Sequence, residues 1–285
     1  FMKKNLLIVV ILAVCSIEMV KGQTVADSLA IVSACWKIEN FQKGIVYKYA
    51  SIPQLYQGPQ SISLIEIDPV AGLKVGVAVS DKMKETSKIA SEYNAIAAIN
   101  GSYFDMKRGN SVCFLKADRQ IIDTTMQSEF KLRVTGAINV RKGKIKLIPW
   151  SKQIEKEYEG ETGMVLASGP LMLKDGQICD WNSCGANFIR TKHPRSAVAT
   201  TKEGKILLIT VDGRFPEQAE GVNIPELAHL IRILGGEDAL NLDGGGSTTL
   251  WLSGASDDGV VNYPCDNGRF DHAGERKVPN ILYIH

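Results

Sequence analysis

Residues 239–249 read Ala-Leu-Asn-Leu-Asp-Gly-Gly-Gly-Ser-Thr-Thr, and this stretch carries the strongest structural signal in the chain. Leu240 and Leu242 alternate with polar neighbours, which predicts a strand with one buried face. Three consecutive glycines forgo side-chain packing and lose the most entropy on ordering. Such a loop is expected where the backbone takes unusual torsions, or where a ligand approaches its N–H groups. With the adjoining acid and hydroxyls it can cradle a phosphate or sugar oxygen. The alternative is a tight turn without a ligand.

Polar clusters also follow other apolar runs. Asp212 comes directly after Ile-Leu-Leu-Ile-Thr-Val, and Asn100 comes directly after Ile-Ala-Ala-Ile. If these strands neighbour the strand before the glycines and run the same way, two carboxylates, an amide and Arg214 meet at one rim of a sheet. Taken singly, each cluster has a simpler explanation, because Asn-Gly and Asp-Gly pairs are common in turns.

The remaining pattern predicts an α+β fold. Short strand-like runs dominate, and hairpin turns are expected at residues 141–144 and 202–205. The clearest helix covers residues 225–234, with a proline in its first turn and two glycines after its end. A second helix is expected over residues 84–93. We predict a single domain with mixed β-sheets, hairpins and a few packed helices.

Composition bounds the class of protein. A chain of 285 residues can bury a full core, and no repeat or long linker divides it. Hydrophobic residues make up 45%, charged residues 22%, and the formal net charge is +2. This balance gives no reason to expect nucleic acid as a partner, so any anion site must be local. The sequence does not indicate an oligomeric state.

The first residues have the pattern of a secretory signal peptide. Lys3 and Lys4 form a basic start, and an apolar segment too short to span a bilayer follows. The chain is accordingly divided into three parts, namely a signal peptide at residues 1–22, an N-terminal extension at residues 23–42 and a main domain at residues 43–285.

The predicted location follows from this leader. The protein is expected to be exported, either to the periplasm or out of the cell. Leu-Ala-Val-Cys15 resembles a lipoprotein acylation site, but valine before the cysteine fits poorly, so soluble export is favoured over a lipid anchor. No later stretch is long and apolar enough for stable membrane insertion.

The cysteines give no complete disulfide framework. Five remain once the leader is removed, and an odd number argues against full pairing. Cys179 and Cys184 flank a turn-like loop and could pair in an oxidising compartment, or they could be free thiols. No CxxC pair or His/Cys cluster indicates zinc, so neither a metal nor another cofactor is expected.

The residue types limit the reaction. Two acids can serve glycosyl transfer, and Arg195 and Arg214 can each hold a phosphate through two hydrogen bonds. The glycine loop lacks the Gly-Lys-Ser/Thr ending of a nucleotide P-loop. Ser247 does not lie in a Gly-x-Ser-x-Gly elbow, and no Gly-x-Gly-x-x-Gly fingerprint occurs. A serine hydrolase or a dinucleotide-binding enzyme is therefore disfavoured.

Taken together and in order, the motifs resemble the phosphodiester glycosidase family, and the likeness runs from about residue 46 to 284. The motifs that carry it are Asn100-Gly101-Ser102-Tyr103-Phe104, Ser168-Gly169-Pro170, His193-Pro194-Arg195-Ser196-Ala197, Asp212-Gly213-Arg214, Asn241-Leu242-Asp243-Gly244-Gly245-Gly246-Ser247 and Glu275-Arg276.

The resemblance implies hydrolysis of the bond between an α-linked amino sugar, similar to N-acetylglucosamine, and the phosphate of a phosphodiester. The products are free sugar and a phosphomonoester. A signal-bearing chain of this size is typical of bacterial members, whose substrate would be a small or polymeric phosphoglycan such as capsule, teichoic-type or host material. Residues 43–285 would then be the catalytic domain.

The resemblance also implies roles for individual residues. Asp212 and Asp243 are the candidates for nucleophile or acid/base, in an order left open, and Glu275 joins them as a candidate catalytic acid or sugar-positioning group. The other expected contacts are with the phosphate or the sugar, through Arg195, Arg214, His193, Asn100, Gly244, Gly245, Gly246 and Ser247.

Two alternatives remain open. A metal-dependent phosphodiesterase would cut the P–O bond, with Asp212, Asp243, Asn100 and His193 as ligands of Mg²⁺ or Mn²⁺. A non-catalytic phosphoglycan-binding protein could use the same scaffold, because a fold does not guarantee a function.

Overall fold

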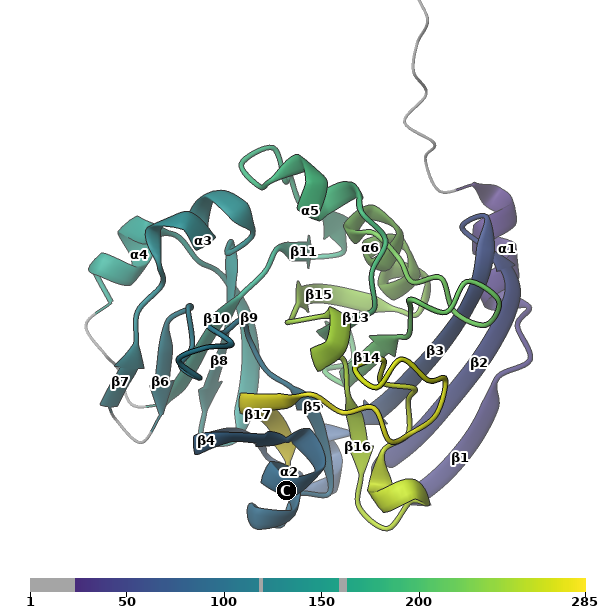
Figure 1. The fold of residues 1–285 in the computed structure, drawn as a ribbon, viewed down its shortest axis with the longest axis horizontal. Helices are drawn as coiled ribbons and strands as arrows, with labels where there is room; N and C mark the ends of the chain where they lie inside the picture. Colours follow the sequence, from purple (N-terminus) through teal and green to yellow (C-terminus); the bar gives the residue numbers. More distant parts are fainter. Residues whose placement is uncertain (1–23, 118–119, 159–162) are drawn as a thin grey trace, which may run out of the picture.

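Three antiparallel sheets surround one apolar core in the computed structural model, which describes residues 24–117, 120–158 and 163–285 (Figure 1). The predicted signal peptide lies outside these described residues. The strands labelled β1 to β3 curve along one side of the molecule, and β6 to β10 lie on the opposite side. The four strands β4, β5, β16 and β17 lie between them at the lower edge of this view.

The eight-stranded sheet carries both acidic motifs. Its order is β1-β2-β3-β14-β13-β15-β11-β12, and every neighbouring pair is antiparallel. In sheet order the bounds are β1 Lys37–Gln42, β2 Ile45–Leu55, β3 Gly58–Ile67, β14 Ile206–Val211, β13 Arg195–Thr201, β15 Gly236–Asn241, β11 Leu171–Lys174 and β12 Gln177–Ile178.

Two smaller sheets complete the fold. The five-stranded sheet contains β7 Gln120–Asp123, β6 Leu115–Ala117, β10 Met164–Ser168, β8 Gly136–Arg141 and β9 Lys144–Pro149. The four-stranded sheet contains β16 Leu250–Leu252, β5 Ala97–Asn100, β17 Lys277–Ile284 and β4 Val75–Glu85. The α-helices are α1 Val25–Val32, α2 Thr86–Glu92, α3 Gln127–Leu132, α4 Lys152–Lys156, α5 Ala186–Arg190 and α6 Ile224–Ile233. Three short 3₁₀ turns lie at Pro69–Ala71, Gly245–Ser247 and Asp257–Gly259.

The core is shared by all three sheets. Leu208 and Leu240 from the eight-stranded sheet, Ile138 from the five-stranded sheet and Ile99 from the four-stranded sheet belong to one buried cluster. The other face of the eight-stranded sheet packs on α6 and α1. Burial of apolar surface stabilises the fold by about 25 cal/mol per Å², so the common cluster holds the three sheets in one unit.

The observed elements confirm the predicted α+β single domain. Helix α6 begins with a capping box between Asn223 and Glu226, and its proline lies in the first turn. Both predicted hairpins are present, because Arg141 pairs with Lys144 and Thr200 with Ile206 across their turns. In residues 24–42 the helix α1 ends at Val32, and β1 then pairs with β2.

The N-terminal extension is packed on the main domain. Ile31 of α1 is buried in the cluster that includes α6, and β1 forms the edge of the eight-stranded sheet. Cys179 and Cys184 are free thiols in this structure. Among the described residues, no helix has the length and apolar character needed to cross a membrane.

Candidate active site

Strands β14 and β15 deliver the two acidic motifs to the same edge of the eight-stranded sheet. Strand β13 lies between them and pairs antiparallel with both, so β14 and β15 run in the same direction. Asp212 follows the end of β14, and Asp243 lies two residues after the end of β15. The two strands therefore run in the same direction, as a shared rim requires, although β13 separates them and the strand that ends at Asn100 belongs to the four-stranded sheet.

Three loops meet at this edge through close backbone contacts. The Gly245 N–H donates to the carbonyl oxygen of Pro194 at 2.9 Å. A Cβ on Gly244 would lie 2.5 Å from the same oxygen, and a Cβ on Gly213 would lie 2.8 Å from the Pro194 nitrogen. Such approaches exclude any side chain, which explains glycine at these positions. The His-Pro-Arg, Asp-Gly-Arg and triglycine motifs are thus packed together.

Asn100 connects this edge to the four-stranded sheet. It ends β5 and is fully buried. Its Nδ2 donates to the carbonyl oxygen of Asp243 at 2.7 Å, and its Oδ1 accepts from Ser196 Oγ at 2.6 Å and from the Thr249 N–H at 3.1 Å. Both polar atoms of the Asn100 side chain are thus engaged within the protein, and its contact with a sugar hydroxyl stays a prediction. The amide fixes the glycine loop.

A second buried amide anchors the Ser-Gly-Pro motif. Asn241 Nδ2 donates to the carbonyl oxygen of Gly169 at 2.9 Å and to the Tyr103 hydroxyl at 2.7 Å. The Tyr103 hydroxyl in turn donates to the Gly169 carbonyl at 2.5 Å. Because buried polar groups are costly unless they are paired, this network specifies the local geometry.

Asp243 lies among positive charges. Burial raises the pKa of its carboxyl group, and the Ser247 hydroxyl, the Arg133 guanidinium, the Gly244 N–H and Arg276 act in the opposite direction. The Gly244 N–H donates to Asp243 Oδ1 at 3.0 Å. Ser247 is itself fully buried, and its hydroxyl oxygen has no hydrogen-bond partner within the part of the chain that the structure describes.

Two arginines flank the glycine loop. A Cβ on Gly245 would lie 2.9 Å from Arg214 Nη2, and a Cβ on Gly246 would collide with the guanidinium of Arg276. Arg214 is exposed, and its Nη1 donates to Cys265 Sγ at 3.6 Å. Arg276 Nε donates to Asp266 Oδ1 at 3.0 Å. Two guanidinium groups and two carboxylates, those of Asp243 and Asp266, thus lie beside the loop, and Arg276 is ion-paired with Asp266. The guanidinium of Arg214 is the exposed one, which suits an anionic ligand.

Asp212 is buried, and Asn262 and Tyr263 of a neighbouring loop donate hydrogen bonds to it. Only 1% of the residue is exposed. Its Oδ2 accepts from Ser61 Oγ at 2.7 Å, and its Oδ1 accepts from Asn262 Nδ2 at 2.9 Å and from the Tyr263 N–H at 3.0 Å. Burial raises the pKa of Asp212 to about 6, against the lowering effect of these donors. Both oxygens are therefore engaged within the protein.

Arg195 uses its guanidinium inside the fold. It is 2% exposed, and its Nη2 donates to the carbonyl oxygens of Thr191 at 2.9 Å and Phe188 at 3.1 Å. Its Nε donates to the carbonyl oxygen of Val222 at 3.2 Å. Burial lowers the pKa of Arg195 to about 10. In this structure the donors of Arg195 hold backbone in place, and its contact with phosphate stays a prediction.

His193 lies close enough to Arg195 and Arg214 to feel their charges. Burial lowers its pKa, and the positive charges of Arg195 and Arg214 lower it further. A neutral imidazole near Arg214 can exchange hydrogen bonds but does not add the positive charge that a phosphate would favour.

Glu275 and Arg276 point to different parts of the molecule. Glu275 Oε1 accepts from the Ser87 N–H at 3.0 Å and its Oε2 accepts from Ser87 Oγ at 2.5 Å, at the start of α2. Burial raises the pKa of Glu275. The carboxylate thus caps a helix, and its catalytic or sugar-positioning role stays a prediction. Arg276 is the member of this pair that reaches the glycine loop.

Three N–H groups of the glycine loop also donate to acceptors within the protein. The Gly244 N–H donates to Asp243, the Gly245 N–H to Pro194, and the Ser247 N–H to the Gly244 carbonyl at 3.2 Å. These three N–H groups are therefore engaged within the protein, while the side chains of Arg214 and Arg276 lie beside the loop, and the phosphate contact of the loop amides stays a prediction.

Sequence reasoning missed Arg133 at this site. Its guanidinium carbon lies 3.5 Å from the centroid of the Tyr103 ring, its Nε donates to Glu129 at 2.7 Å, and its charge acts on Asp243. Arg133 follows α3 without any motif around it, so nothing in the sequence marks it. Arg276 was part of the Glu275-Arg276 motif, but the sequence did not show that its side chain points to the glycine loop.

The geometry does not assemble a metal site from the described residues. Nowhere in residues 24–117, 120–158 and 163–285 do three His, Cys, Asp or Glu side chains gather as a metal-binding group. Asp212 and Asn100, two of the suggested ligands, already accept hydrogen bonds from the protein. The metal-dependent alternative gains no support from these contacts.

The chain has relatives of known name. The sequence profile of the family described as phosphodiester glycosidase matches residues 93–285. N-acetylglucosamine-1-phosphodiester alpha-N-acetylglucosaminidase from Mus musculus is 24% identical over 205 residues, which is 66% of this chain and 37% of that protein. The Homo sapiens protein of the same name is 24% identical over 222 residues, 71% of this chain and 39% of that protein. The chain thus spans less than two fifths of the length of these curated relatives.

Solved structures show the same fold. The zebrafish N-acetylglucosamine-1-phosphodiester alpha-N-acetylglucosaminidase catalytic domain, auto-inhibited by its pro-peptide, aligns with a TM-score of 0.64 at 20% identity, covering 87% of this chain and 85% of that one. A candidate exported protein from Burkholderia pseudomallei aligns with a TM-score of 0.58 at 15% identity, covering 82% and 75%. Because the family profile covers more than half of the chain and contains every motif discussed above, this protein belongs to the phosphodiester glycosidase family.

Proposed function

We propose that this protein hydrolyses the bond between an α-linked amino sugar and the phosphate of a phosphodiester, releasing free sugar and a phosphomonoester. The observation that carries the proposal is the carboxylate of Asp243 beside a glycine loop flanked by Arg214 and Arg276. The names of the mouse and human relatives supply the class of sugar, N-acetylglucosamine.

The chemistry needs only one carboxylate at the reacting carbon. The departing group is a phosphomonoester, whose second pKa is about 6, so it leaves without the protonation that an alcohol requires. Arg214 and Arg276 would neutralise its charge through paired hydrogen bonds. Asp243 would attack the anomeric carbon or activate a water molecule there. Arg133 would favour the ionised form of Asp243, because its positive charge opposes the effect of burial.

The other predicted residues would act on this group indirectly. Asp212 would position the segment that carries Tyr263, and Arg195 would position the loop before β13. Asn100 would hold the carbonyl of Asp243. His193 would contact the phosphate or orient Arg214. The two-acid assignment is thereby reduced to Asp243 as the catalytic residue and Asp212 as a positioning residue.

Product identity tests the proposal. The substrate is the methyl phosphodiester of α-N-acetylglucosamine 1-phosphate, incubated with wild type and with Asp243→Asn, with and without EDTA. We expect free N-acetylglucosamine and methyl phosphate, unchanged by EDTA, and a fall of about 10²–10⁴ in kcat for the variant. Sugar phosphate as product, formed only with a divalent ion, would instead establish the metal-dependent phosphodiesterase. Retained ligand without turnover would establish a binding protein.

We also propose that the protein is exported and that residues 43–285 form its catalytic domain. The basic and apolar start of the sequence supports export, and one structural neighbour is a candidate exported protein. Mass spectrometry of the protein secreted from a bacterial host should find an N-terminus near Gln23. A mature protein that retains residues 1–22 would contradict this.

A further inference from the structure

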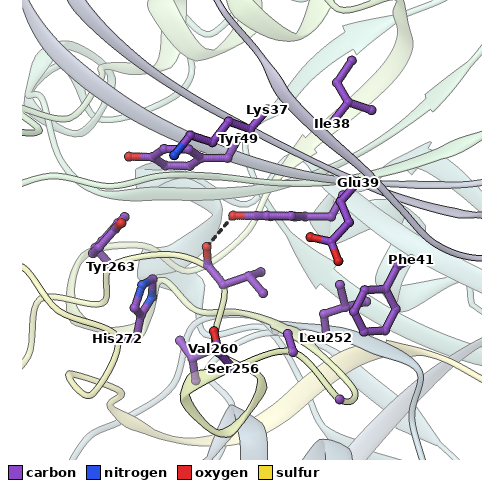
Figure 2. A pocket seen from close by; sticks show the side chains of 14 residues that line it. Lys37, Ile38, Glu39, Phe41, Tyr49, Leu252, Ser256, Val260, Tyr263 and His272 are labelled. Carbon is purple, nitrogen blue, oxygen red and sulfur yellow. Dashed lines mark hydrogen bonds between the residues drawn. The ribbon is translucent and has the colours of Figure 1, made fainter.

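Two recesses of similar size take no part in the mechanism above, and they differ in charge. The first, of about 610 Å³, lies between β1, β2 and residues 252–272. Its lining carries charges of both signs, Lys37 and Glu39, and the dashed line in Figure 2 shows the Tyr47 hydroxyl donating to the carbonyl oxygen of Val261. The second, of about 570 Å³, is lined by the lysines Lys74, Lys142, Lys144 and Lys146. The second recess therefore gathers charge of one sign.

Close packing between three segments builds this second recess, which we call the lysine groove. The Val75 N–H donates to the carbonyl oxygen of Gly143 at 2.9 Å, so the start of β4 is tied to the turn between β8 and β9. A Cβ on Gly143 would lie 2.6 Å from Lys74 Cγ, and glycine there lets the lysine stem pass the turn. Lys144 and Lys146 share one face of β9, because alternate residues of a strand point the same way. The backbone thus brings the amines together.

The charge of the lysine groove is not neutralised from within the fold. None of the ion pairs formed by residues 24–117, 120–158 and 163–285 involves its four lysines. The acidic residue of the lining, Asp238, is already engaged, because it accepts from Lys174 Nζ at 2.9 Å and from the Asp175 N–H at 2.9 Å. Like charges gathered in one recess repel one another, and an anionic ligand would relieve that repulsion.

The lysine groove lies at the far end of the strands that carry the candidate site. Strand β13 begins at Arg195 near the glycine loop, and Thr200 and Thr201 at its other end line the groove. Ile206, the first residue of β14, lines the groove, and Asp212 follows the last residue of that strand. At about 3.4 Å per residue, this strand places the two sites roughly 20 Å apart. A small diester cannot reach both, whereas a polymer can.

We propose that the lysine groove is a second anion site, which binds a phosphate group of a phosphoglycan chain several units away from the bond that is cleaved. The inference rests on the proposed function for the identity of that chain. Lysine amines would contact the phosphate oxygens, and the apolar lining residues Leu73, Ile145 and Ile206 would pack against the carbon skeleton of the adjoining sugar. The groove would thus favour long substrates over short ones.

The shape and the surrounding charges favour a chain over a bilayer as the occupant. The amines line a recess, whereas a bilayer presents a flat face. Acids also flank the groove, because Glu203 is exposed on the turn next to the lining residue Gly204, and the Asp175 side chain is 81% exposed beside Asp238. An anionic bilayer pressed onto the lysines would meet these acids, whereas a narrow chain would pass between them.

A simpler role for two of the lysines is protection of a sheet edge. Strand β9 is the last strand of its sheet, and lysines on an edge strand hinder pairing with other molecules. That role predicts no affinity for phosphate chains, so a binding measurement separates it from the proposal.

The binding test uses a fluorescent decamer of α-N-acetylglucosamine 1-phosphate units joined by phosphodiester bonds. Every protein in this test carries Asp243→Asn, so that the proposed hydrolysis does not consume the probe. The groove variant changes three lysines to glutamine and a charge-keeping variant changes the same three to arginine, at Lys74, Lys144 and Lys146. The matched control changes three exposed lysines outside the groove to glutamine, at Lys82, Lys152 and Lys156.

The glutamine variant of the groove should bind the decamer about tenfold more weakly than the parent, because three charge contacts are lost together. The arginine variant and the matched control should bind within about twofold of the parent. Equal weakening by the groove variant and the matched control would mean that only net charge matters and would overturn the proposal. Thermal unfolding of all four proteins verifies that each is folded.

Kinetics with Asp243 intact give a second readout. The groove variant should raise KM for the decamer about tenfold with kcat nearly unchanged, and should hydrolyse the methyl phosphodiester of α-N-acetylglucosamine 1-phosphate as wild type does. Equal impairment of the decamer and the methyl diester would overturn the proposal, because a remote site cannot act on a substrate that is too short to reach it.

The binding arm also separates failure of this inference from failure of the proposed function. If wild type hydrolyses neither substrate, the proposed function fails, and weaker decamer binding by the groove variant alone would still support the anion site. Vesicles of phosphatidylglycerol serve as the competing ligand. Vesicle binding that is lost in the groove variant, while decamer binding is unchanged, would overturn the proposal in favour of a membrane contact.

Discussion

The side-chain amide of Asn100 donates a 2.7 Å hydrogen bond to the carbonyl oxygen of Asp243, and this contact helps to join two sheets at the candidate site. Asn100 ends a strand of the four-stranded sheet, while Asp243 follows a strand of the eight-stranded sheet. The position of the proposed catalytic carboxylate therefore depends on how the sheets pack, and not on its own loop alone.

Asp212 should make stability depend on pH. Its folded-state pKa of about 6 exceeds the unfolded value of 3.8, so the native state binds the proton more tightly. Its contribution is present at low pH and is lost as the pH rises from about 4 to about 6. Asp212→Asn imitates the protonated acid and removes this dependence. Urea unfolding between pH 4 and 7 should show wild type losing stability relative to the variant, and a constant difference would contradict the assignment.

Activity should require an arginine at position 214, and lysine should not replace it. Arg214→Lys keeps the charge but loses the planar pair of donors, so kcat/KM for the methyl diester should fall by about tenfold or more. Competitive inhibition by inorganic phosphate should weaken in parallel. Arg108→Lys is the matched control, because the Arg108 side chain is 80% exposed elsewhere on the surface. Equal activity of Arg214→Lys and wild type would remove Arg214 from the phosphate site.

Gly245 should serve the site rather than the fold alone. Gly245→Ala places a Cβ 2.9 Å from Arg214 Nη2 in a backbone with φ +62°. Gly204→Ala has a similar backbone, with φ +81°, but meets no atom within 4 Å. Both variants should lose about 1–2 kcal/mol of stability, and only Gly245→Ala should also lose activity. Thermal unfolding and kcat/KM measured on both variants check this, and matching activities would refute the role of the loop.

Glu275 should matter for stability more than for catalysis. Glu275→Ala removes the acceptor of the Ser87 N–H at the start of α2, which should cost about 0.5–2 kcal/mol. Its kcat, measured well below the unfolding temperature, should stay within about threefold of wild type, since catalytic acids contribute far more. A hundredfold loss of kcat in a folded variant would return Glu275 to the catalytic group.

Local signals predicted the elements well. The proline and the two following glycines mark α6 to within about a residue at each end. The condition for a shared rim is met in part, because β14 and β15 run in the same direction, but β13 separates them and the strand that ends at Asn100 lies in another sheet. These features depend on residues close in sequence, where helix caps, turns and alternation report directly on structure.

The assignment of roles depended on contacts that no local pattern encodes. Asp212 was expected at an open rim, but residues 262 and 263 cross over it and use its oxygens. Neighbours on extended backbone point in opposite directions, and the sequence does not say whether Glu275 or Arg276 faces the glycine loop. Arg133 reaches Asp243 from the end of α3, far away in the sequence.

The bond that is broken tests the central claim most directly. Hydrolysis of the methyl phosphodiester of α-N-acetylglucosamine 1-phosphate in ¹⁸O-labelled water, followed by mass spectrometry, shows where the water oxygen goes. If Asp243 directs attack at the anomeric carbon while Arg214 and Arg276 hold the departing phosphate, the label enters the released sugar and methyl phosphate stays unlabelled. Label in the phosphate product would mean cleavage of a P–O bond and would contradict the account.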